Sequence, residues 1–257
     1  MIRDLAENPN VHQPLSAGRE LVTDPRGRWA LYLGAGTGAH DATVQRVRLR
    51  EEEVEGAVEE IRALLSQRGR AGAEWELGES RTPTDLVERL GRLGIHPDED
   101  EPVAIGMVLR GPLAEPPPDG VTARRVESLD ELVLARRIQH EAFGITGDDP
   151  EPDRAPDDYA AEGVGGSTFL AFVDGAPVAA AYAAYTPAGL LLFGGATLPA
   201  ARGRGAYRGL VAARATEALE RGTPVLVTHA GHMSQPILER LGFERLARID
   251  RLLDVLG

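Results

Sequence analysis

Residues 190–219 read LLLFGGATLPAARGRGAYRGLVAARATEAL, and this stretch decides the fold. It begins as an apolar strand, continues through a short arginine-glycine loop and becomes a helix. The first N–H groups of a helix have no partner inside the helix and carry the positive end of its dipole, so such a junction binds phosphate or pyrophosphate. Gly203 and Gly205 let the backbone approach the anion closely. We expect three arginines to add positive charge there: Arg202, Arg204 and Arg208.

The spacing of the glycines excludes two common phosphate motifs. The loop has neither the G-x-x-x-x-G-K-[ST] pattern of P-loops nor the G-x-G-x-x-G pattern of dinucleotide-binding folds. Residues 202–207 instead resemble the R/Q-x-x-G-x-G/A signature of the GNAT superfamily of N-acetyltransferases, whose loop holds the pyrophosphate of acetyl-coenzyme A. Tyr207 departs from this signature, because the family usually has glycine or alanine at that place.

The elements around the loop follow the order of the same family. Strands are predicted before it at Phe169–Val173, Val178–Tyr185 and Leu190–Leu198. After the loop and its helix, the apolar run Pro224–Thr228 predicts a strand, and SQPILERLGF at 234–243 predicts a capped helix that ends at glycine. That L-G-F ending resembles a second recurrent element of the family, a helix that packs beside the cofactor. An opening strand and helix are expected at Val121–Glu127 and Leu129–Phe143.

The resemblance implies an α/β (α+β) GNAT fold, with a mixed, mostly antiparallel central sheet flanked by helices. The N-terminal half repeats part of the pattern, since LVERLGRLGI at 86–95 resembles ILERLGF at 237–243. Three adjacent prolines in the segment before residue 120 indicate an extended connection. We therefore predict two related domains: a degenerate GNAT-like domain at 1–112, a proline-rich linker at 113–119 and a catalytic GNAT acetyltransferase domain at 120–257.

The N-terminal half lacks the anion-binding junction. Between its strand ending at Leu49 and the following helix lies only Arg50-Glu51-Glu52-Glu53, which contains no glycine. Carboxylates at a helix start offset the dipole and repel a pyrophosphate. We expect that this half does not bind coenzyme A in the usual way and instead helps to shape the acceptor cleft.

A second glycine-rich stretch, Gly34–Gly38, also follows a predicted strand. It leads through Ala39-His40-Asp41 into another strand and not into a helix, so the argument for phosphate binding does not apply. The pattern favours a hairpin turn.

The composition narrows the functional class. There is no cysteine, which excludes disulfides, thiolate metal sites and a cysteine nucleophile. The formal net charge is −12 and all 28 basic residues are arginine, a balance that opposes binding to nucleic acid or an anionic membrane. The N-terminal residues lack the basic-then-apolar order of a secretion signal, so we expect a cytoplasmic protein. The bias toward Arg, Ala and Gly resembles that of GC-rich bacterial genomes, so we expect a bacterial source. Whether it forms a homodimer stays open.

The resemblance also implies the ligands. Acetyl-CoA would be the acyl donor, an amine of a small molecule or peptide would be the acceptor, and no metal is required. The strand end Gly195-Ala196-Thr197-Leu198 would pair with the pantetheine chain and meet the oxyanion. The pyrophosphate would lie over the loop and first helical turn, at Gly203, Arg204, Gly205, Ala206, Tyr207 and Arg208.

The catalytic groups are less clear from the sequence. Many members of the superfamily have a tyrosine that protonates the departing thiolate where this chain has Leu238. Substitute acids are Ser234, His229 and Tyr207, each of which also has a structural role open to it. Candidate bases near the first helix are Glu141, His140 and Glu162. The alternative to an N-acetyltransferase is a non-catalytic acyl-CoA-binding sensor.

Overall fold

A computed structural model describes residues 1–16, 18–145 and 154–256. The chain forms two compact units. Unit 1 comprises Met1–Gly106, Ala230–Met233 and the segment from Arg245 onward, and unit 2 comprises Met107–His229 and Ser234–Glu244.

Unit 1 is built on a small mixed sheet with the strand order β1-β2-β3-β4-β12. Its strands are β1 (Glu20–Thr23), β2 (Ala30–Leu33), β3 (Ala42–Gln45), β4 (Gly72–Leu77), the short β5 (His96–Pro97) and most of β12 (Glu244–Val255). Its helices are α1 (Ile2–Glu7), η1 (Pro9–Val11), η2 (Ala39–Asp41), η3 (Glu51–Glu53), α2 (Val54–Gln67) and α3 (Leu86–Arg92). The connection from β3 through α2 to the parallel strand β4 buries Ile61 and Trp75 in one apolar core.

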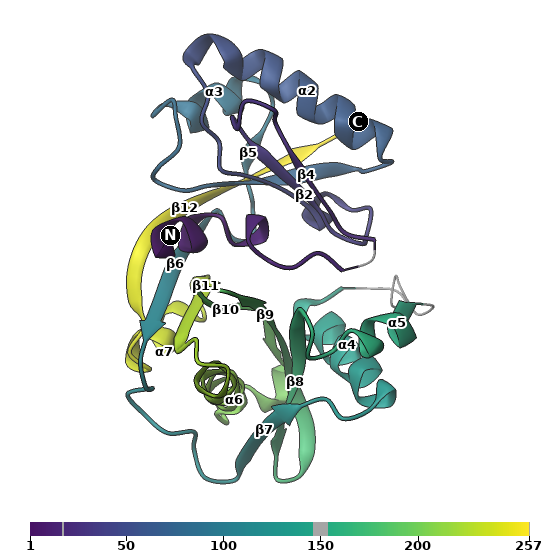
Figure 1. Cartoon of the computed structure of the whole chain (residues 1–257), viewed down its shortest axis with the longest axis vertical. Helices are drawn as coiled ribbons and strands as arrows, with labels where there is room; N and C mark the ends of the chain where they lie inside the picture. Colours follow the sequence, from purple (N-terminus) through teal and green to yellow (C-terminus); the bar gives the residue numbers. More distant parts are fainter. Residues whose placement is uncertain (17, 146–153, 257) are drawn as a thin grey trace. The chain divides into compact units, whose positions relative to one another are not determined.

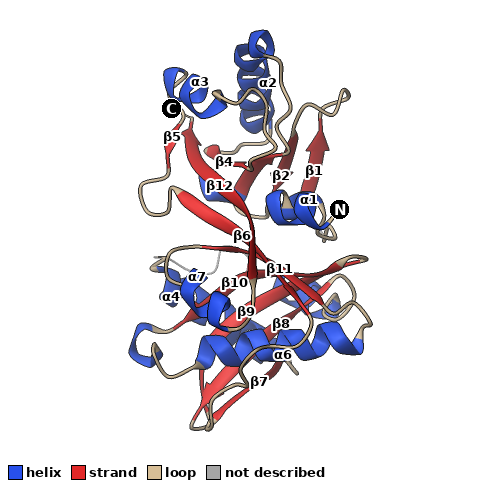
Figure 2. Ribbon diagram, turned by 90° about the vertical axis from the view of Figure 1, so that its left-hand side faces the viewer, coloured by secondary structure: helices blue, strands red, loops and turns tan. Residues whose placement is uncertain are grey.

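Unit 2 has a larger sheet, in which β7, β8, β9, β10 and β11 are neighbours in that order. These strands are β7 (Val121–Arg125), β8 (Gly166–Val173), β9 (Ala176–Thr186), β10 (Gly189–Thr197) and β11 (Val225–Ala230). Its helices are α4 (Leu129–Phe143), α5 (Ala155–Ala160), η5 (Pro199–Ala201), α6 (Ala206–Glu220) and α7 (Gln235–Arg240). The pairs are antiparallel except β10–β11, which is parallel and is connected through α6. Helices α4 and α5 cover one face of this sheet and α6 covers the other (Figure 1), and Figure 2 shows α6 lying across β8.

The predicted fold class is confirmed, because the strands of each unit form a mixed, mostly antiparallel part of one sheet and are flanked by helices. Most predicted elements lie within a few residues of their expected bounds, and α4 has the predicted range. The compact units differ from the predicted domains at the C-terminal end. Residues Asp250–Val255 of β12 pair antiparallel with β4, so the last strand completes the sheet of unit 1. Strand β6 (Val103–Arg110) likewise has residues in both units. The boundary at 113–119 stays a prediction.

The helices α3 and α7, whose sequences are alike, end in the same way. In each, the residue after a left-handed glycine donates its N–H to a carbonyl five residues earlier: Ile95 to Leu90 at 3.0 Å and Phe243 to Leu238 at 3.0 Å. Gly94 and Gly242 have φ of 84° and 96°, a conformation that favours glycine. The two units therefore share a local structure as well as a sequence pattern.

None of the helices among the described residues is both long and apolar enough to span a membrane.

Candidate donor and catalytic site

A bulge interrupts strand β10 at the two glycines of Phe193-Gly194-Gly195-Ala196. Phe193 lies opposite Tyr182 of β9 and Ala196 lies opposite Ala180, so Gly194 and Gly195 face a single β9 residue. Gly194 has φ of 57°, and its carbonyl accepts a hydrogen bond from Gln139 Nε2 of α4 at 2.8 Å. The bulge frees backbone groups of β10 from the regular ladder.

The pairing between β10 and β11 ends beside this bulge. The parallel register runs from Leu190 and Leu226 to Leu192 and Thr228. The Thr228 hydroxyl closes it by donating to the carbonyl of Leu192 at 3.0 Å. Beyond that point β10 continues to Thr197 without a β11 partner in the register, which leaves this end of the strand free to pair with a ligand.

The loop after β10 leads into α6 through two left-handed glycines, Gly203 with φ of 78° and Gly205 with φ of 88°. Among the described residues, no protein acceptor is present for the backbone N–H groups from Gly203 to Arg208. The first turn of α6 contains no acidic residue. The junction is therefore a row of free donors at the positive end of a helix of 15 residues.

The arginines of this loop bind protein groups, which differs from their expected role. Arg204 forms an ion pair with Asp174 in the β8–β9 turn, and Arg208 contacts Glu115 and the carbonyl of Pro116, both at 3.0 Å. Arg202 donates to the carbonyls of Thr197 and Ala142 at 3.4 and 3.2 Å. The backbone N–H groups thus remain as the free donors of the loop.

Residues of the predicted linker 113–119 pack against the loop. A Cβ at Gly205 would lie 2.2 Å from Cγ of Pro118, so only glycine fits there without displacing that proline. A Cβ at Gly203 would meet nothing within 4 Å. Gly205 therefore has a packing role, whereas Gly203 faces open space.

Tyr207 extends from the first turn of α6 to the bulge. A Cβ at Gly195 would lie 2.8 Å from Cε2 of the Tyr207 ring, so the ring lies directly on this glycine. The side chains of Tyr207 and Ser234, at the start of α7, are hydrogen bonded. Burial raises the pKa of Tyr207, against smaller lowering effects of Arg214 and Ser234, so its hydroxyl stays protonated at neutral pH. The structure brings together two of the three candidate acids at the bulge.

A buried arginine lies beside this tyrosine. Arg214 of α6 is 1% exposed and has no carboxylate partner among the described residues. Its Nη1 donates to the carbonyl of Tyr182, opposite the bulge, at 3.3 Å, and its Nη2 lies 3.8 Å from a Cβ position on Gly195. Burial lowers the pKa of Arg214 to about 10. Its charge therefore acts in surroundings of low polarity next to the bulge.

The three candidate bases differ in exposure and in their hydrogen-bond partners. Glu141 is exposed, and it lies two residues beyond Gln139, so it is on the opposite side of α4 from the bulge. His140 is half-buried, and its carbonyl caps the end of the helix. Glu162 accepts from the Thr168 N–H at 2.8 Å and from its hydroxyl at 2.7 Å. Burial raises the pKa of Glu162, although both bonds to Thr168 oppose that rise.

Glu162 lies in line with the bulge across the sheet. Thr168, its partner, is opposite Tyr182, which in turn is opposite Phe193 beside the bulge. Direct cross-strand partners point to the same face of a sheet, so the side chains of Thr168, Tyr182 and Phe193 share one face. Leu170 and Ala180, two residues along the same strands, are on that face too and pack against α4, so this is the face that α4 covers. Tyr185 is on the other face, where its hydroxyl contacts Glu217 of α6.

The remaining residues considered from the sequence lie at the ends of β10, β11 and α7. His229 is half-buried and follows the last paired residue of β11. Leu238 is fully buried and anchors the end of α7, as Leu90 does in α3. Thr197, the last residue of β10, has a buried Oγ1 without a hydrogen-bond partner among the described residues.

Two residues of this site, Gln139 and Arg214, were not predicted. Each is a polar residue four positions after a buried one on the same helix face, namely Ala135 and Leu210. A polar side chain that continues an apolar stripe is a usable signal, because it must find a partner inside the protein. The sequence gives no indication that this partner would be the β10 bulge.

The corresponding junction of unit 1, between β3 and α2, is closed, in the sense that a carboxylate of the protein accepts a backbone hydrogen bond at the helix start. The N–H of Arg50 donates to Glu53 at 2.9 Å, and Glu53 also forms an ion pair with the Arg50 side chain at 3.0 Å. Hydrogen bonds from the side chain and the backbone of Arg50 lower the pKa of Glu53 to about 2. A carboxylate of the chain itself thus occupies the start of this helix.

Comparisons with known proteins identify the fold. The whole chain superposes on a GCN5-related N-acetyltransferase from Kribbella flavida with a TM-score of 0.71 and 24% identity, over 96% of that chain. A tandem GNAT protein from the clavulanic acid biosynthesis pathway matches the whole chain at 17% identity, over 88% of its own length, with a TM-score of 0.60. A GCN5-related N-acetyltransferase from Sphaerobacter thermophilus matches 94% of the chain at 17% identity, over 82% of its length, with a TM-score of 0.60. No family model and no curated protein sequence matches.

Proposed function

We propose that this chain, which has the fold of tandem GNAT proteins, is an acetyl-CoA-dependent N-acetyltransferase whose unit 2 transfers an acetyl group to an amine. The observation that carries the proposal combines two features: N–H groups at the start of α6 without an acceptor among the described residues, and a bulged end of β10 that pairs with β9 but has no β11 partner in the register. A phosphate-bearing ligand with a hydrogen-bonding arm needs both features.

The residues present fit acetyl-CoA as the donor. The N–H groups from Gly203 to Arg208 would hold the pyrophosphate, and the free edge of β10 from Gly195 to Leu198 would pair with the pantetheine amides. The unpartnered hydroxyl of Thr197 lies on this same edge and would gain a partner from such a chain. Arg202, Arg204 and Arg208 would fix the loop through their protein contacts, with the backbone supplying the anion contacts.

Tyr207 takes the role of the acid in this proposal. Its hydroxyl is hydrogen bonded to Ser234, and its ring lies on Gly195 where the thioester would be placed. A protonated hydroxyl there would donate to the sulfur as the C–S bond breaks, with Arg214 stabilising the developing negative charge. Because a thiolate is a good leaving group, with an ordinary pKa of about 8.5 for a cysteine thiol, the acid supplies only part of the rate.

Glu162 takes the role of the base. It binds Thr168, which lies in line with Tyr182 and Phe193 on the α4 face, and the raised pKa of Glu162 favours proton uptake. The amine nitrogen would attack the acetyl carbonyl, the carbonyl oxygen would face the bulge N–H groups, and the amine proton would pass to Glu162. His229 and Glu141 would then have no direct part in the reaction.

The test follows free CoA released from acetyl-CoA over a panel of amines, with the full chain. Because the chain contains no cysteine, a thiol reagent detects the released CoA without background from the protein. The proposal requires release that depends on at least one amine. It also requires that acetyl-CoA raise the melting temperature, since a ligand of the native state stabilises it. Absence of any stabilisation would contradict binding itself.

A second candidate function is a non-catalytic sensor that binds acyl-CoA. The observation in its favour is Leu238, a buried apolar residue where many members of the superfamily have a catalytic tyrosine. Binding of acetyl-CoA without release of CoA for any amine of the panel would support the sensor over the enzyme.

A further inference from the structure

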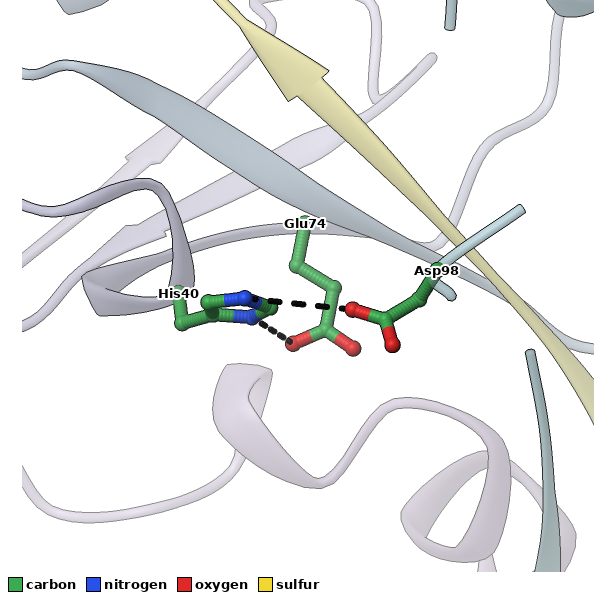
Figure 3. A group of neighbouring side chains, drawn as sticks. All are labelled: His40, Glu74 and Asp98. Atoms are coloured by element: carbon green, nitrogen blue, oxygen red, sulfur yellow. Dashed lines mark ion pairs between the residues drawn. The ribbon is translucent and has the colours of Figure 1, made fainter. Parts of the chain in front are cut away.

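Three possible metal ligands meet in unit 1, away from the elements discussed above. His40 comes from η2, Glu74 from β4, and Asp98 from the segment directly after β5 (Figure 3). One donor atom of each lies within 4.8 Å of the others. The His40 ring is between the two carboxylates, with Nδ1 3.8 Å from Oε2 of Glu74 and Nε2 3.8 Å from Oδ2 of Asp98.

Both carboxylates are buried and held in place by other groups. Glu74 is 5% exposed and Asp98 is 6% exposed. Oε1 of Glu74 accepts from Arg251, and Oδ1 of Asp98 accepts from the N–H groups of Asp100 and Glu101 at 2.9 and 2.8 Å. In each carboxylate one oxygen is therefore fixed by the protein, and the other faces the imidazole. This arrangement orients ligand oxygens before an ion arrives.

The glycine-rich turn positions the histidine. Gly34 N–H donates to the carbonyl of Asp41 at 2.6 Å, and Gly38 N–H donates to its carboxylate at 2.9 Å. A Cβ at Gly36 would lie 2.3 Å from Oδ2 of Asp41, so the turn wraps tightly around this side chain. The predicted hairpin between β2 and β3 is confirmed, and its tip presents His40 to Glu74.

The charges around the cluster favour a cation. Arg251, which contacts Glu74, also contacts the carboxylates of Glu76 and Glu101 at 3.9 and 2.8 Å, and Glu101 lies 3.7 Å from His232 as well. One guanidinium thus faces three carboxylates directly, and Asp98 faces the His40 ring. Glu74 and Asp98 are both buried, and a buried carboxylate is costly unless a positive charge lies beside it.

We propose that His40, Glu74 and Asp98 form a binding site for one divalent cation of the zinc class. One imidazole nitrogen and two carboxylate oxygens without thiolate suit Zn²⁺ and similar ions, and water would complete the coordination. Donors bound to a single ion at about 2.1 Å lie roughly 3 to 4 Å apart, close to the spacing in the structure. The ion would tie the β2–β3 turn to β4 and to the segment after β5. Its role would be structural and independent of acetyl transfer.

No metal was expected, because the family resemblance implies none. The three proposed ligands are separated by 34 and 24 positions and follow no ligand motif, so the sequence carries no signal for this site. Only the pairing of β3 with β4, and of β5 with β12 beside β4, brings the three segments together.

The test is calorimetric titration of the full, chelator-treated chain with Zn²⁺, followed by Co²⁺ absorption spectroscopy. We expect one ion per chain, and d–d bands of Co²⁺ that show bound imidazole and oxygen ligands. His40→Ala removes an exposed side chain and should weaken Zn²⁺ binding at least about 10-fold. Asp98→Asn keeps the oxygen that accepts from the backbone and should have a similar effect.

His96→Ala is the matched control, since His96 is an exposed histidine of the same unit whose ring belongs to no such cluster. Its Zn²⁺ affinity should equal that of the wild type. Equal Zn²⁺ affinity in His40→Ala and wild type, or no saturable binding by the wild type, would overturn the proposal. In the second case His40 would be only an ion-pair partner of the two carboxylates, and its removal would change the melting temperature with or without Zn²⁺.

Discussion

The chain has two corresponding strand-to-helix junctions, β10–α6 in unit 2 and β3–α2 in unit 1. They differ in whether the protein itself supplies a negative charge at the start of the helix. Both follow a strand that pairs in parallel with the strand after the helix. In unit 1 the chain places Glu51, Glu52 and Glu53 at the helix start, and Glu53 accepts from the backbone of Arg50. In unit 2 the helix start is bare, with N–H groups that have no acceptor among the described residues.

The difference shows how one fold can gain or lose an anion site through a few residues. A helix start is stabilised by any negative charge, whether it belongs to the protein or to a ligand. When the chain supplies its own carboxylate, the unit gains stability and loses the site. When the chain leaves the donors free, a ligand must complete the junction.

The largest effect should come from placing a carboxylate in the open junction. Gly203→Glu puts a charged side chain into open space beside the free N–H groups, so it should imitate unit 1. We expect acetyl-CoA affinity to fall at least about 100-fold, or roughly 2.7 kcal/mol, in calorimetric titration. Gly222→Glu is the control, because Gly222 has a similar φ of 71° and also faces open space, at the other end of α6.

Both variants strain a left-handed residue and should lose about 1 kcal/mol of folding stability. Only Gly203→Glu should lose the ligand. Equal affinities in the two variants would place the acyl donor away from the β10–α6 junction. Gly205 is a poorer position for this test, because its substitution would also displace Pro118.

A smaller effect is expected at Glu162, the proposed base in unit 2. Glu162→Gln keeps a group that accepts from Thr168 but removes the proton acceptor. The value of kcat/KM for the amine should fall about 100-fold. In the wild type, kcat/KM should rise with pH through the raised pKa of Glu162, and the variant should lose this acidic limb.

The ionisation of Glu162 also affects folding stability, in the opposite direction: activity should rise with pH, whereas the contribution of Glu162 to stability should fall. Because its pKa is higher in the folded state than the ordinary value, its contribution favours folding at low pH and is lost as the pH rises through the folded pKa. Glu162→Gln should therefore be at least as stable as the wild type at neutral pH. An unchanged pH profile in the variant would exclude Glu162 as the base.

Removing the tyrosine hydroxyl should have a more modest effect. Tyr207→Phe keeps the ring on Gly195 and removes the proposed acid, so kcat should fall about 10-fold while the KM for acetyl-CoA stays nearly constant. Tyr185→Phe, which removes a buried hydroxyl on the α6 face, serves as the control and should retain kcat. A kcat of Tyr207→Phe equal to that of the wild type would show that Tyr207 is not the acid and that the thiolate takes its proton from solvent.

The smallest effect is expected at the closed junction. Glu53→Gln should destabilise the protein slightly at neutral pH and leave acetyl-CoA binding unchanged. Since the pKa of Glu53 is depressed to about 2, its stabilisation is present above the ordinary pKa of about 4.5 and disappears as the pH falls toward 2. The difference in unfolding free energy between variant and wild type should shrink over the same range. New acetyl-CoA binding in Glu53→Gln would mean that the carboxylate alone closes unit 1.

The sequence was sufficient for the elements of the fold, because local patterns decide them. The turn glycines, the apolar alternation of β8 to β10 and the capped helix α4 all act over a few residues. The partner of β12 could not be predicted in this way. Asp254 of that strand is buried against Arg62 of α2, which is 192 positions away, and no local pattern indicates such a pair.

In the candidate donor site, the backbone positions could be predicted from the sequence and the side-chain contacts could not. The loop of Gly203 and Gly205 and the strand end at Gly195 were identified from residue type and order. The side chains around the bulge were not, since the contact of Tyr207 with Ser234 and that of Gln139 with Gly194 depend on how helices pack on the sheet. The candidate bases Glu141, His140 and Glu162 could not be distinguished from the sequence, because their positions relative to the bulge depend on how α4 packs on the sheet.

The measurement that tests the central contrast most directly is the stoichiometry of acetyl-CoA binding to the full chain by calorimetric titration. An open junction in unit 2 and a closed one in unit 1 predict one acetyl-CoA per chain, and Gly203→Glu should weaken that binding at least about 100-fold. Two molecules per chain, or one that still binds to Gly203→Glu with full affinity, would contradict the assignment of donor binding to unit 2.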